Sequence, residues 1–265
     1  MWYEWFPMLK RTKPMAIKLC AFALLLACAP PAAARDALAA GLVYLRDIDA
    51  SIVQDMRYAG ADNFVGHPLP GYRAAECLLR RDVALALKRV QADLAKSALG
   101  LKVYDCYRPT RAVAAMARWA QDGAVNNPTK RFYPALAKRT LFAQGYIAAH
   151  SVHSTGAAVD LTLVPRPATP AAPYDPATRY GACTAPQAAR APDNSLDMGT
   201  GFDCFDVKSH TASAAIDAAQ QRARAMLLSA MRARGFKNYF REWWHFTLGP
   251  RPPRAFDVPI APRLR

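Results

Sequence analysis

The 265-residue sequence lacks several patterns that would assign a function directly. It has no C-x-x-C pair, which argues against a cysteine-based zinc cluster. Neither Ser151 nor Ser154 lies in a G-x-S-x-G or S-x-x-K motif, which argues against a serine hydrolase. No zinc-finger motif, RNP-type motif or dense lysine and arginine run is present, so nothing predicts binding of nucleic acid. Internal repeats are also absent, and only five histidines are available for metal or acid-base chemistry.

The N-terminal residues 1–34 have the pattern of a secretory signal. Basic residues precede the apolar run LCAFALLLACA and the small-residue stretch PPAAA, and this run is too short to cross a bilayer as a helix. A cleavage site after Ala34 would leave residues 35–265 as one exported, periplasmic domain. Alternatively, LLAC resembles a lipoprotein box, which would anchor the protein to a membrane through lipid on Cys28.

Export changes the interpretation of the cysteines. Removal of the signal leaves Cys77, Cys106, Cys183 and Cys204, an even number in an oxidising compartment, which predicts two disulfides. Four cysteines allow three pairings. The pairs Cys77–Cys106 and Cys183–Cys204 are favoured because each closes a loop of moderate length.

The sequence is strongly basic, with a formal net charge of +15. Such a charge favours loose electrostatic association with an anionic wall polymer or membrane surface. Scattered arginines on an ordinary solvated surface explain the charge better than any specific anionic partner does, so the charge identifies no specific partner. The sequence also predicts no oligomeric state.

The first half of the domain alternates helical and strand patterns. Residues 76–99 carry apolar side chains at helical spacing, which predicts a helix. Residues 101–107 are typical of a strand, and the following helix has Pro109 near its first turn and Gly123 just beyond its last. Arg108 therefore lies at a strand-to-helix junction, where a rigid scaffold can position a functional group.

The second half contains more irregular sequence. AAVDLTLV and YFREWWHFTL are typical of strands, and a helix over residues 212–234 is predicted to end at Gly235. Residues 165–194 are rich in proline, alanine and arginine and contain Cys183, which predicts a surface insertion held by a disulfide. Residues 249–265 lack periodicity and are expected to form an extended tail.

The segment HSVHSTGAAVDLTL, residues 150–163, contains the most informative group of polar side chains. A catalytic zinc ion takes three protein ligands and keeps one position open, and His153 and Asp160 are separated by small residues that let the chain turn. The sequence EWWH adds His245 as a third ligand and Glu242 as a general base beside it. On a regular strand, however, residues three apart face opposite sides, so this pair requires a strand end, a bulge or a strong twist.

Five motifs in order resemble one known family. SVHSTGAAVDLTL is similar to S-x-H-x-x-G-x-A-x-D and EWWHF to E-x-W-H, and the stretches YAGADNF, YDCYRP and DMGTGFD also match. Together they span Tyr58 to Phe246. The family is that of the zinc D-alanyl-D-alanine dipeptidases, which are D,D-peptidases related to hedgehog domains. The resemblance implies an α+β fold, a single domain with a central, mostly antiparallel sheet flanked by helices.

The resemblance also implies a role for each matched residue. One Zn²⁺ per chain would be held by His153, Asp160 and His245, with Glu242 as catalytic base. Arg108 would stabilise the developing oxyanion, because its guanidinium is permanently charged and its donors are fixed. Tyr58, Ser151 and Asp203 would form the substrate pocket, where the acidic side chain receives the free ammonium of a small D-amino-acid dipeptide.

The expected reaction is zinc-dependent hydrolysis of D-alanyl-D-alanine in cell-wall dipeptide turnover. Two alternatives remain: a D,D-carboxypeptidase acting on peptidoglycan stem peptides, and a non-catalytic, zinc-containing wall-binding module. The presence of Glu242 argues against the second. The connection between Asp160 and DMGTGFD is longer than is usual in the family, so the insertion could reshape the pocket. His67, His150 and His210 are given no role.

Overall fold

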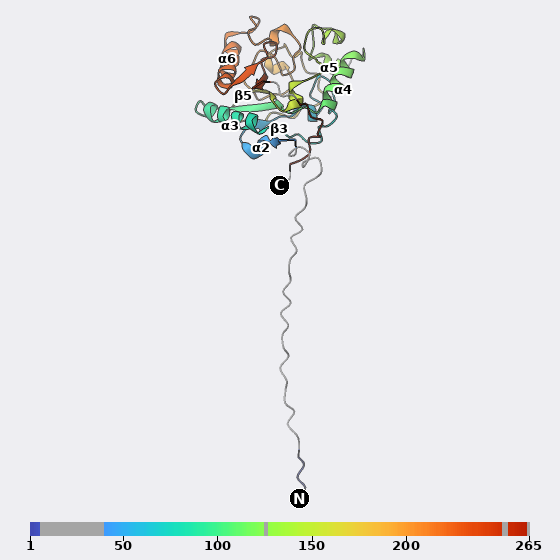
Figure 1. The fold of residues 1–265 in the computed structure, drawn as a ribbon, viewed down its shortest axis with the longest axis vertical. Coiled ribbons are helices and arrows are strands. Elements are labelled where there is room, and N and C mark those ends of the chain that lie inside the picture. Colours follow the sequence, from blue (N-terminus) through green and yellow to red (C-terminus); the bar gives the residue numbers. More distant parts are fainter. Residues whose placement is uncertain (6–39, 125–126, 251–253, 264–265) are drawn as a thin grey trace.

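The computed structural model describes residues 1–5, 40–124, 127–250 and 254–263 (Figure 1). Cys28 and most of the predicted signal segment lie outside these residues. Among the helices of the described ranges, none combines the length and the apolar character needed to cross a bilayer.

A five-stranded sheet organises the domain, in the order β2-β4-β5-β7-β6. Only the β2–β4 pair is parallel, and the other neighbouring strands are antiparallel. The strands are β2 (Val53–Gln54), β4 (Leu99–Asp105), β5 (Ala158–Pro165), β6 (Phe236–Asn238) and β7 (His245–Leu248). A second, two-stranded antiparallel sheet pairs β1 (Leu42–Tyr44) with β3 (Leu78–Arg80). The predicted α+β fold with a mostly antiparallel sheet is confirmed.

The two central strands are buried on both faces, since nearly every residue of β4 and β5 is inaccessible to solvent. Helix α3 (Arg81–Ala95) packs against β4, helix α6 (Ala218–Arg232) contacts β5 and β6, and the two helices touch each other (Figure 1). The buried side chains of α3 recur at helical spacing. Central strands covered on both sides give the site a rigid platform.

The helix predicted over residues 76–99 is shorter in the structure. It begins at Arg81, because Leu78–Arg80 instead form β3 and pair with β1. It ends at Ala95, and Leu99 already belongs to β4. Periodicity alone misses the first end because strand pairing overrides local helical preference there. At the second end, Ala98 has a φ of 54°, which does not continue a helix.

The remaining helices follow their sequence signals more closely. Helix α4 spans Thr110–Gln121, directly after Pro109. Helix α6 begins later than residue 212 because Asp217 caps it, accepting a hydrogen bond from the backbone of Gln220 in a capping box. The shorter helical segments are α2 (Leu45–Ile48), α5 (Asn127–Lys130), η1 (Arg57–Ala59), η2 (Lys138–Thr140), η3 (Val152–Thr155), η4 (Gln187–Ala189) and η5 (Val207–Ser209).

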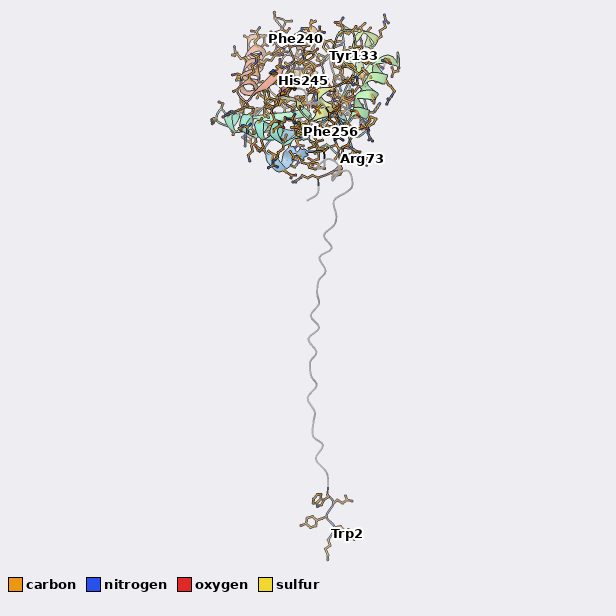
Figure 2. The ribbon with its side chains drawn as sticks, in the orientation of Figure 1. Trp2, Arg73, Tyr133, Phe240, His245 and Phe256 are labelled. Carbon is orange, nitrogen blue, oxygen red and sulfur yellow. A yellow bond between two sulfur atoms is a disulfide. The ribbon has the colours of Figure 1, made fainter. Side chains whose placement is uncertain are left out.

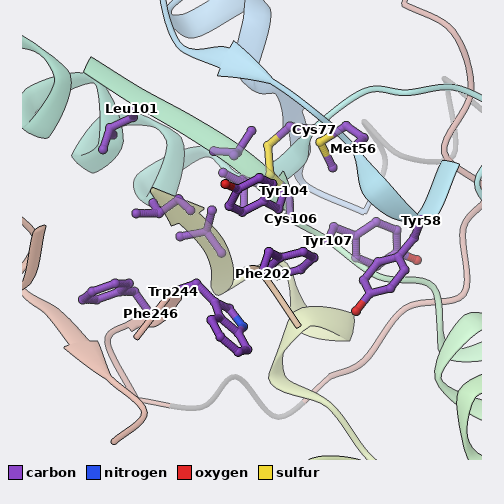
Figure 3. Packing of buried hydrophobic residues seen from close by; sticks show 14 of the residues in the cluster. Met56, Tyr58, Cys77, Leu101, Tyr104, Cys106, Tyr107, Phe202, Trp244 and Phe246 are labelled. Atoms are coloured by element: carbon purple, nitrogen blue, oxygen red, sulfur yellow. A yellow bond between two sulfur atoms is a disulfide. The ribbon is translucent and has the colours of Figure 1, made fainter. Parts of the chain in front are cut away.

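Two disulfides join segments distant in the sequence. Cys77 pairs with Cys106 at a Cα–Cα distance of 5.3 Å, and Cys183 pairs with Cys204 at 5.4 Å. These are the pairings that the loop lengths favour. Figure 3 shows the first bond within the core, beside Tyr104 and Tyr107.

The segment predicted as an insertion leaves the sheet at the end of β5 and returns alongside it, where the Leu196 N–H donates to the carbonyl of Leu163. Between these points the chain has no β-strand or α-helix. Its end is anchored by Asp193, which accepts hydrogen bonds from buried Lys102 at 2.6 Å and from Tyr104 at 2.7 Å.

Of the predicted C-terminal tail, the structure describes residues 249–250 and 254–263, which contain no helix and pack against the domain. Ile260 is fully buried and pairs with Tyr72, and the Phe256 N–H donates to the carbonyl of Ser154 at 2.8 Å. Side chains across the domain are drawn in Figure 2, where His245 and the exposed Phe240 are labelled. Through the hydrogen bond between Phe256 and Ser154, the tail supports the turn that carries His153.

Candidate active site

Three predicted metal ligands converge in the structure. The His153 Nε2 atom lies 3.1 Å from His245 Nδ1 and 3.3 Å from Asp160 Oδ1, and His245 Nδ1 lies 3.0 Å from the same carboxylate oxygen. His153 and Asp160 are each 2% exposed. Among the histidine, cysteine and acidic side chains of the described residues, these three have ligand atoms close enough together to hold one metal ion.

The strand register produces this convergence. Asp160 on β5 is paired directly with His245, the first residue of β7, so their side chains project on the same side of the sheet. His153 comes from η3, the short turn that precedes β5. Strand pairing therefore positions Asp160 and His245, and the turn just before β5 positions His153.

Gly156 ends that turn in the left-handed conformation, with φ 72°. A Cβ atom here would lie 2.6 Å from Leu42 Cδ2 and 3.2 Å from the Arg80 backbone nitrogen. Glycine is thus required both by the backbone conformation and by the close approach of β1 and β3. At the other end of the turn, the Ser151 hydroxyl accepts a hydrogen bond from the His153 N–H.

The donor set fits a tetrahedral zinc ion. His153 Nδ1 lies 2.6 Å from the carbonyl oxygen of Cys106, which can only accept, so this nitrogen carries the proton and Nε2 presents a lone pair. Two ligand atoms bound at about 2.0–2.1 Å in a tetrahedral site lie about 3.3 Å apart. The observed separations match this spacing, and a cation would offset the repulsion among lone pairs directed at one point.

Glu242 lies in the turn before β7, so Glu242 and His245 meet at a strand end, one of the three arrangements that their spacing requires. Its Oε2 atom is 3.8 Å from His245 Nδ1. Asn238 holds the turn by donating to the carbonyls of both Glu242 and His245, each at 3.0 Å. Burial, followed by the negative charge of Asp160, raises the pKa of Glu242 to about 8. A carboxyl group with a pKa near neutrality is suited to accepting and returning a proton.

Arg108 is fixed by a residue that the motif comparison left without a role. Asp105 is fully buried and accepts from Arg108 Nε at 2.9 Å, while its other oxygen accepts from the Tyr72 hydroxyl at 2.6 Å. A β-bulge shifts the register between Val103 and Asp105, which brings Asp105 opposite Asp160. The position of Asp105 at the end of β4, three residues before Arg108, is the sequence signal that could have identified it.

Asp203 and Tyr58 form a hydrogen-bonded pair in the site. The Tyr58 hydroxyl donates to Asp203 Oδ2 at 2.7 Å, and the Arg108 guanidinium carbon lies 4.9 Å from the centre of the Tyr58 ring. Burial raises the pKa of Asp203 well above its ordinary value, and the negative charge of Asp160 adds to the effect. A positively charged group placed here would favour the ionised carboxylate.

All eight predicted catalytic, metal and substrate residues line a single cavity of about 330 Å³. Its lining also includes the apolar residues Phe64, Val113, Met116 and Phe205 and the tyrosines Tyr146 and Tyr239. Exposed His150 also lines it, but His67 and His210 do not. The volume suits a small ligand with a few fixed polar groups.

Comparison with known proteins decides the family. A peptidase M15 family model, described as D-ala-D-ala dipeptidase, matches residues 38–168 and 188–260. The chain belongs to this family. It is 36% identical to the D-alanyl-D-alanine dipeptidase of Streptomyces coelicolor over 220 residues, which cover 82% of this chain and 97% of that protein.

Other M15 relatives give the same result. The D-alanyl-D-alanine dipeptidase of Enterococcus faecalis is 32% identical, with 83% of this chain and 98% of that protein covered. The D-alanyl-D-alanine dipeptidase of Escherichia coli is 31% identical, with 83% and 88% covered. The stretch between the two matched parts, residues 169–187, lies inside the segment predicted as an insertion. No residue of 165–194 lines the active-site cavity, so the insertion does not form its wall.

Proposed function

We propose that this chain hydrolyses D-alanyl-D-alanine to two molecules of D-alanine, using one Zn²⁺ held by His153, Asp160 and His245. The observation that carries the proposal is the cavity itself. It brings three converging ligand atoms, the Glu242 carboxyl and the Arg108 guanidinium around a space that suits a dipeptide. The names of the relatives support the substrate.

Zinc in this site would polarise the scissile carbonyl and lower the pKa of a water molecule. Glu242 accepts the proton of the attacking water and returns it to the departing amine, which leaves as D-alanine. Arg108 faces the carbonyl oxygen on which negative charge develops, and its ion pair with Asp105 fixes its donors before the reaction. The Arg108 side chain therefore does not have to move during the chemical step.

Asp203 gives specificity for a free amino terminus. Its carboxylate, held by Tyr58, receives the substrate ammonium at the buried side of the cavity, where Asp203 is 5% exposed. A stem peptide would have to place an amide and further residues at this position. The geometry therefore favours the dipeptidase over the D,D-carboxypeptidase, and the Glu242 position favours an enzyme over a wall-binding module.

We further propose that the protein acts in cell-wall dipeptide turnover, after export to the periplasm. The two disulfides support this location because such bonds persist in oxidising compartments. The N-terminal sequence pattern is consistent with it.

Substrate comparison tests the proposed specificity. The purified protein should release D-alanine from D-alanyl-D-alanine much faster than from an N-acetylated dipeptide or a stem pentapeptide. Asp203→Ala should abolish dipeptide cleavage. If Asp203→Ala instead spares cleavage of the pentapeptide and the wild type prefers that substrate, the carboxypeptidase assignment is correct.

A further inference from the structure

Asp203 has a backbone conformation that few side-chain-bearing residues adopt. Its φ is 55°, and among the described residues Ala98 is the other non-glycine residue with a positive φ. Aspartate tolerates the left-handed region better than most residues, but the conformation is still unfavourable and persists only when the surroundings impose it. The question is which contacts impose it.

The Asp203 backbone is not itself hydrogen bonded within the described residues. Its side chain accepts one hydrogen bond, from Tyr58. The carboxylate also lies near the negative charge of Asp160, which repels it. The repulsion does not hold the residue in place, so its restraint comes from the Tyr58 hydrogen bond and from its neighbours in the chain.

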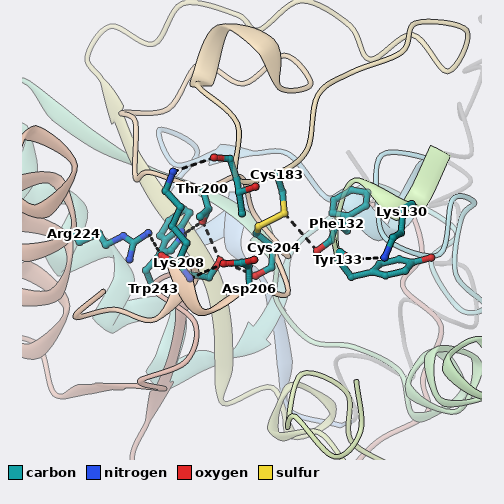
Figure 4. Close-up of a disulfide and its surroundings, with 12 residues drawn as sticks. Lys130, Phe132, Tyr133, Cys183, Thr200, Cys204, Asp206, Lys208, Arg224 and Trp243 are labelled. Carbon is teal, nitrogen blue, oxygen red and sulfur yellow. Dashed lines mark hydrogen bonds between the residues drawn. A yellow bond between two sulfur atoms is a disulfide. The ribbon is translucent and has the colours of Figure 1, made fainter. Parts of the chain in front are cut away.

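Those neighbours are tied to Cys183 on both sides of Asp203. Before it, the Gly201 N–H donates to the carbonyl of Cys183 at 2.8 Å. After it, Cys204 forms the disulfide with Cys183, and both cysteines are buried (Figure 4). Residues 201–204, called the arch below, are thus joined to Cys183 by a hydrogen bond at one end and by the disulfide at the other, with Asp203 between them.

Cys183 is itself anchored to the body of the domain. Its N–H donates to the carbonyl of Arg131 at 2.8 Å, and the Phe205 N–H donates to the carbonyl of Phe132 at 2.7 Å. Without the disulfide, Cys183 would be joined to the arch by a single hydrogen bond, the one from the Gly201 N–H. Cys183 also belongs to an insertion without strands or α-helices. The disulfide is the covalent link between Cys183 and residues 201–204, which are also held by the Ser209 hydroxyl donating to the Cys204 carbonyl at 2.7 Å and by Phe202 stacking on Tyr104.

We infer that the Cys183–Cys204 disulfide is a positioning device for the ammonium-binding end of the site: it holds Asp203 against Tyr58 and thereby sets selectivity for substrates with a free amino terminus. The inference rests on the proposed function. It also gives the insertion a role, since the loop contributes no cavity wall but supplies the cysteine that fixes Asp203. The metal ligands and Glu242 lie outside the arch.

The test uses the double variant C183A/C204A, which removes the bond without leaving an unpaired thiol. Initial rates are measured on D-alanyl-D-alanine and on its N-acetylated form, with zinc content determined for each protein. Misplacement of a binding group by about 1 Å can cost about a hundredfold. We expect the KM for the free dipeptide to rise about tenfold to a hundredfold, with a smaller change in kcat, unchanged zinc content and a lost preference for the free amine.

Leu227→Ala is the control for stability alone. Leu227 is fully buried on α6 and is not part of the cavity lining. Assayed well below the thermal midpoint of either variant, it should retain the wild-type preference for the free amine. A second comparison places C183A/C204A in an Asp203→Asn background. There it should alter the preference for the free amine by less than about twofold, because both changes act through the Asp203 side chain.

The outcomes separate the two claims. A wild-type protein that does not cleave D-alanyl-D-alanine overturns the proposed function, and with it the substrate that this inference concerns. A wild type that cleaves it, together with a C183A/C204A variant that keeps the wild-type KM and preference, overturns the role of the disulfide alone. An equal loss of preference in Leu227→Ala would also overturn that role, because it would reduce the effect to general destabilisation.

Discussion

Replacement of Gly156 by alanine tests how the turn before β5 brings the metal ligands together. The left-handed backbone conformation costs about 1–2 kcal/mol for a residue with a Cβ atom. The new methyl group would also lie 2.6 Å from Leu42 Cδ2, and overpacking of this kind costs about 1–3 kcal/mol. We therefore expect Gly156→Ala to lower the free energy of unfolding by about 2–5 kcal/mol.

Gly41→Ala is a matched control. Gly41 also has a positive φ, 77°, but a Cβ atom there would meet no atom within 4 Å. Urea unfolding of both variants separates backbone strain from steric contact, because only Gly156→Ala has both. If Gly156→Ala is no more destabilising than Gly41→Ala, the close packing of the turn against β1 does not matter.

The same variant should weaken zinc binding. The Gly156 N–H donates to the carbonyl of His153, and the Gly156 carbonyl accepts from the Arg80 N–H, each at 3.0 Å. A shift at Gly156 therefore moves the histidine relative to the ligands on β5 and β7. Competition with a chromophoric chelator should show a lower zinc affinity for Gly156→Ala than for Gly41→Ala, and equal affinities would refute the argument.

Three further predictions concern single carboxylates. Asp105→Asn removes the carboxylate charge that accepts from Arg108 Nε, so kcat/KM should fall about tenfold to a hundredfold while bound zinc is retained. Steady-state kinetics with metal analysis check this, and an unchanged kcat/KM would contradict it. Glu242→Gln should lower kcat by about 10²–10⁴-fold without loss of zinc, whereas a variant with near-normal kcat would exclude Glu242 as the base. Burial alone would raise the pKa of Asp193, but the positive charges of Arg57 and Lys102 outweigh it and hold that pKa below its ordinary value. A depressed carboxyl pKa stabilises the fold above the unfolded-state pKa and is lost as the pH falls, so unfolding free energies measured from neutral pH to below pH ~4 should decline less steeply for Asp193→Asn than for the wild type.

Sequence patterns select residues that the structure brings together in one cavity, because their motifs are local. Zinc-ligand chemistry restricts the choice to histidine and carboxylate, and few histidines are present. The fold class follows from the same family pattern. What the motifs do not contain is geometry: a regular strand through EWWH would separate Glu242 from His245, and only the structure shows the turn that Asn238 stabilises.

Other features depend on contacts between distant segments. Asp105 acquires its position through a β-bulge that depends on pairing with β5, so its side chain could not be assigned from β4 alone. Leu78–Arg80 carry a helical pattern but pair with β1. Ile260 lies in a segment without periodicity, yet it is fully buried beside Tyr72. Tertiary pairing determines each of these outcomes, and no local window of sequence contains it.

The most direct test of the central claim is the release of D-alanine from D-alanyl-D-alanine by one preparation in three states: as purified, after removal of metal by a chelator, and after addition of one equivalent of Zn²⁺. We predict activity in the first state, loss in the second and recovery in the third, with His153→Ala failing to recover. Unchanged activity after complete metal removal, or a fully zinc-loaded wild type that releases no D-alanine, would contradict the account.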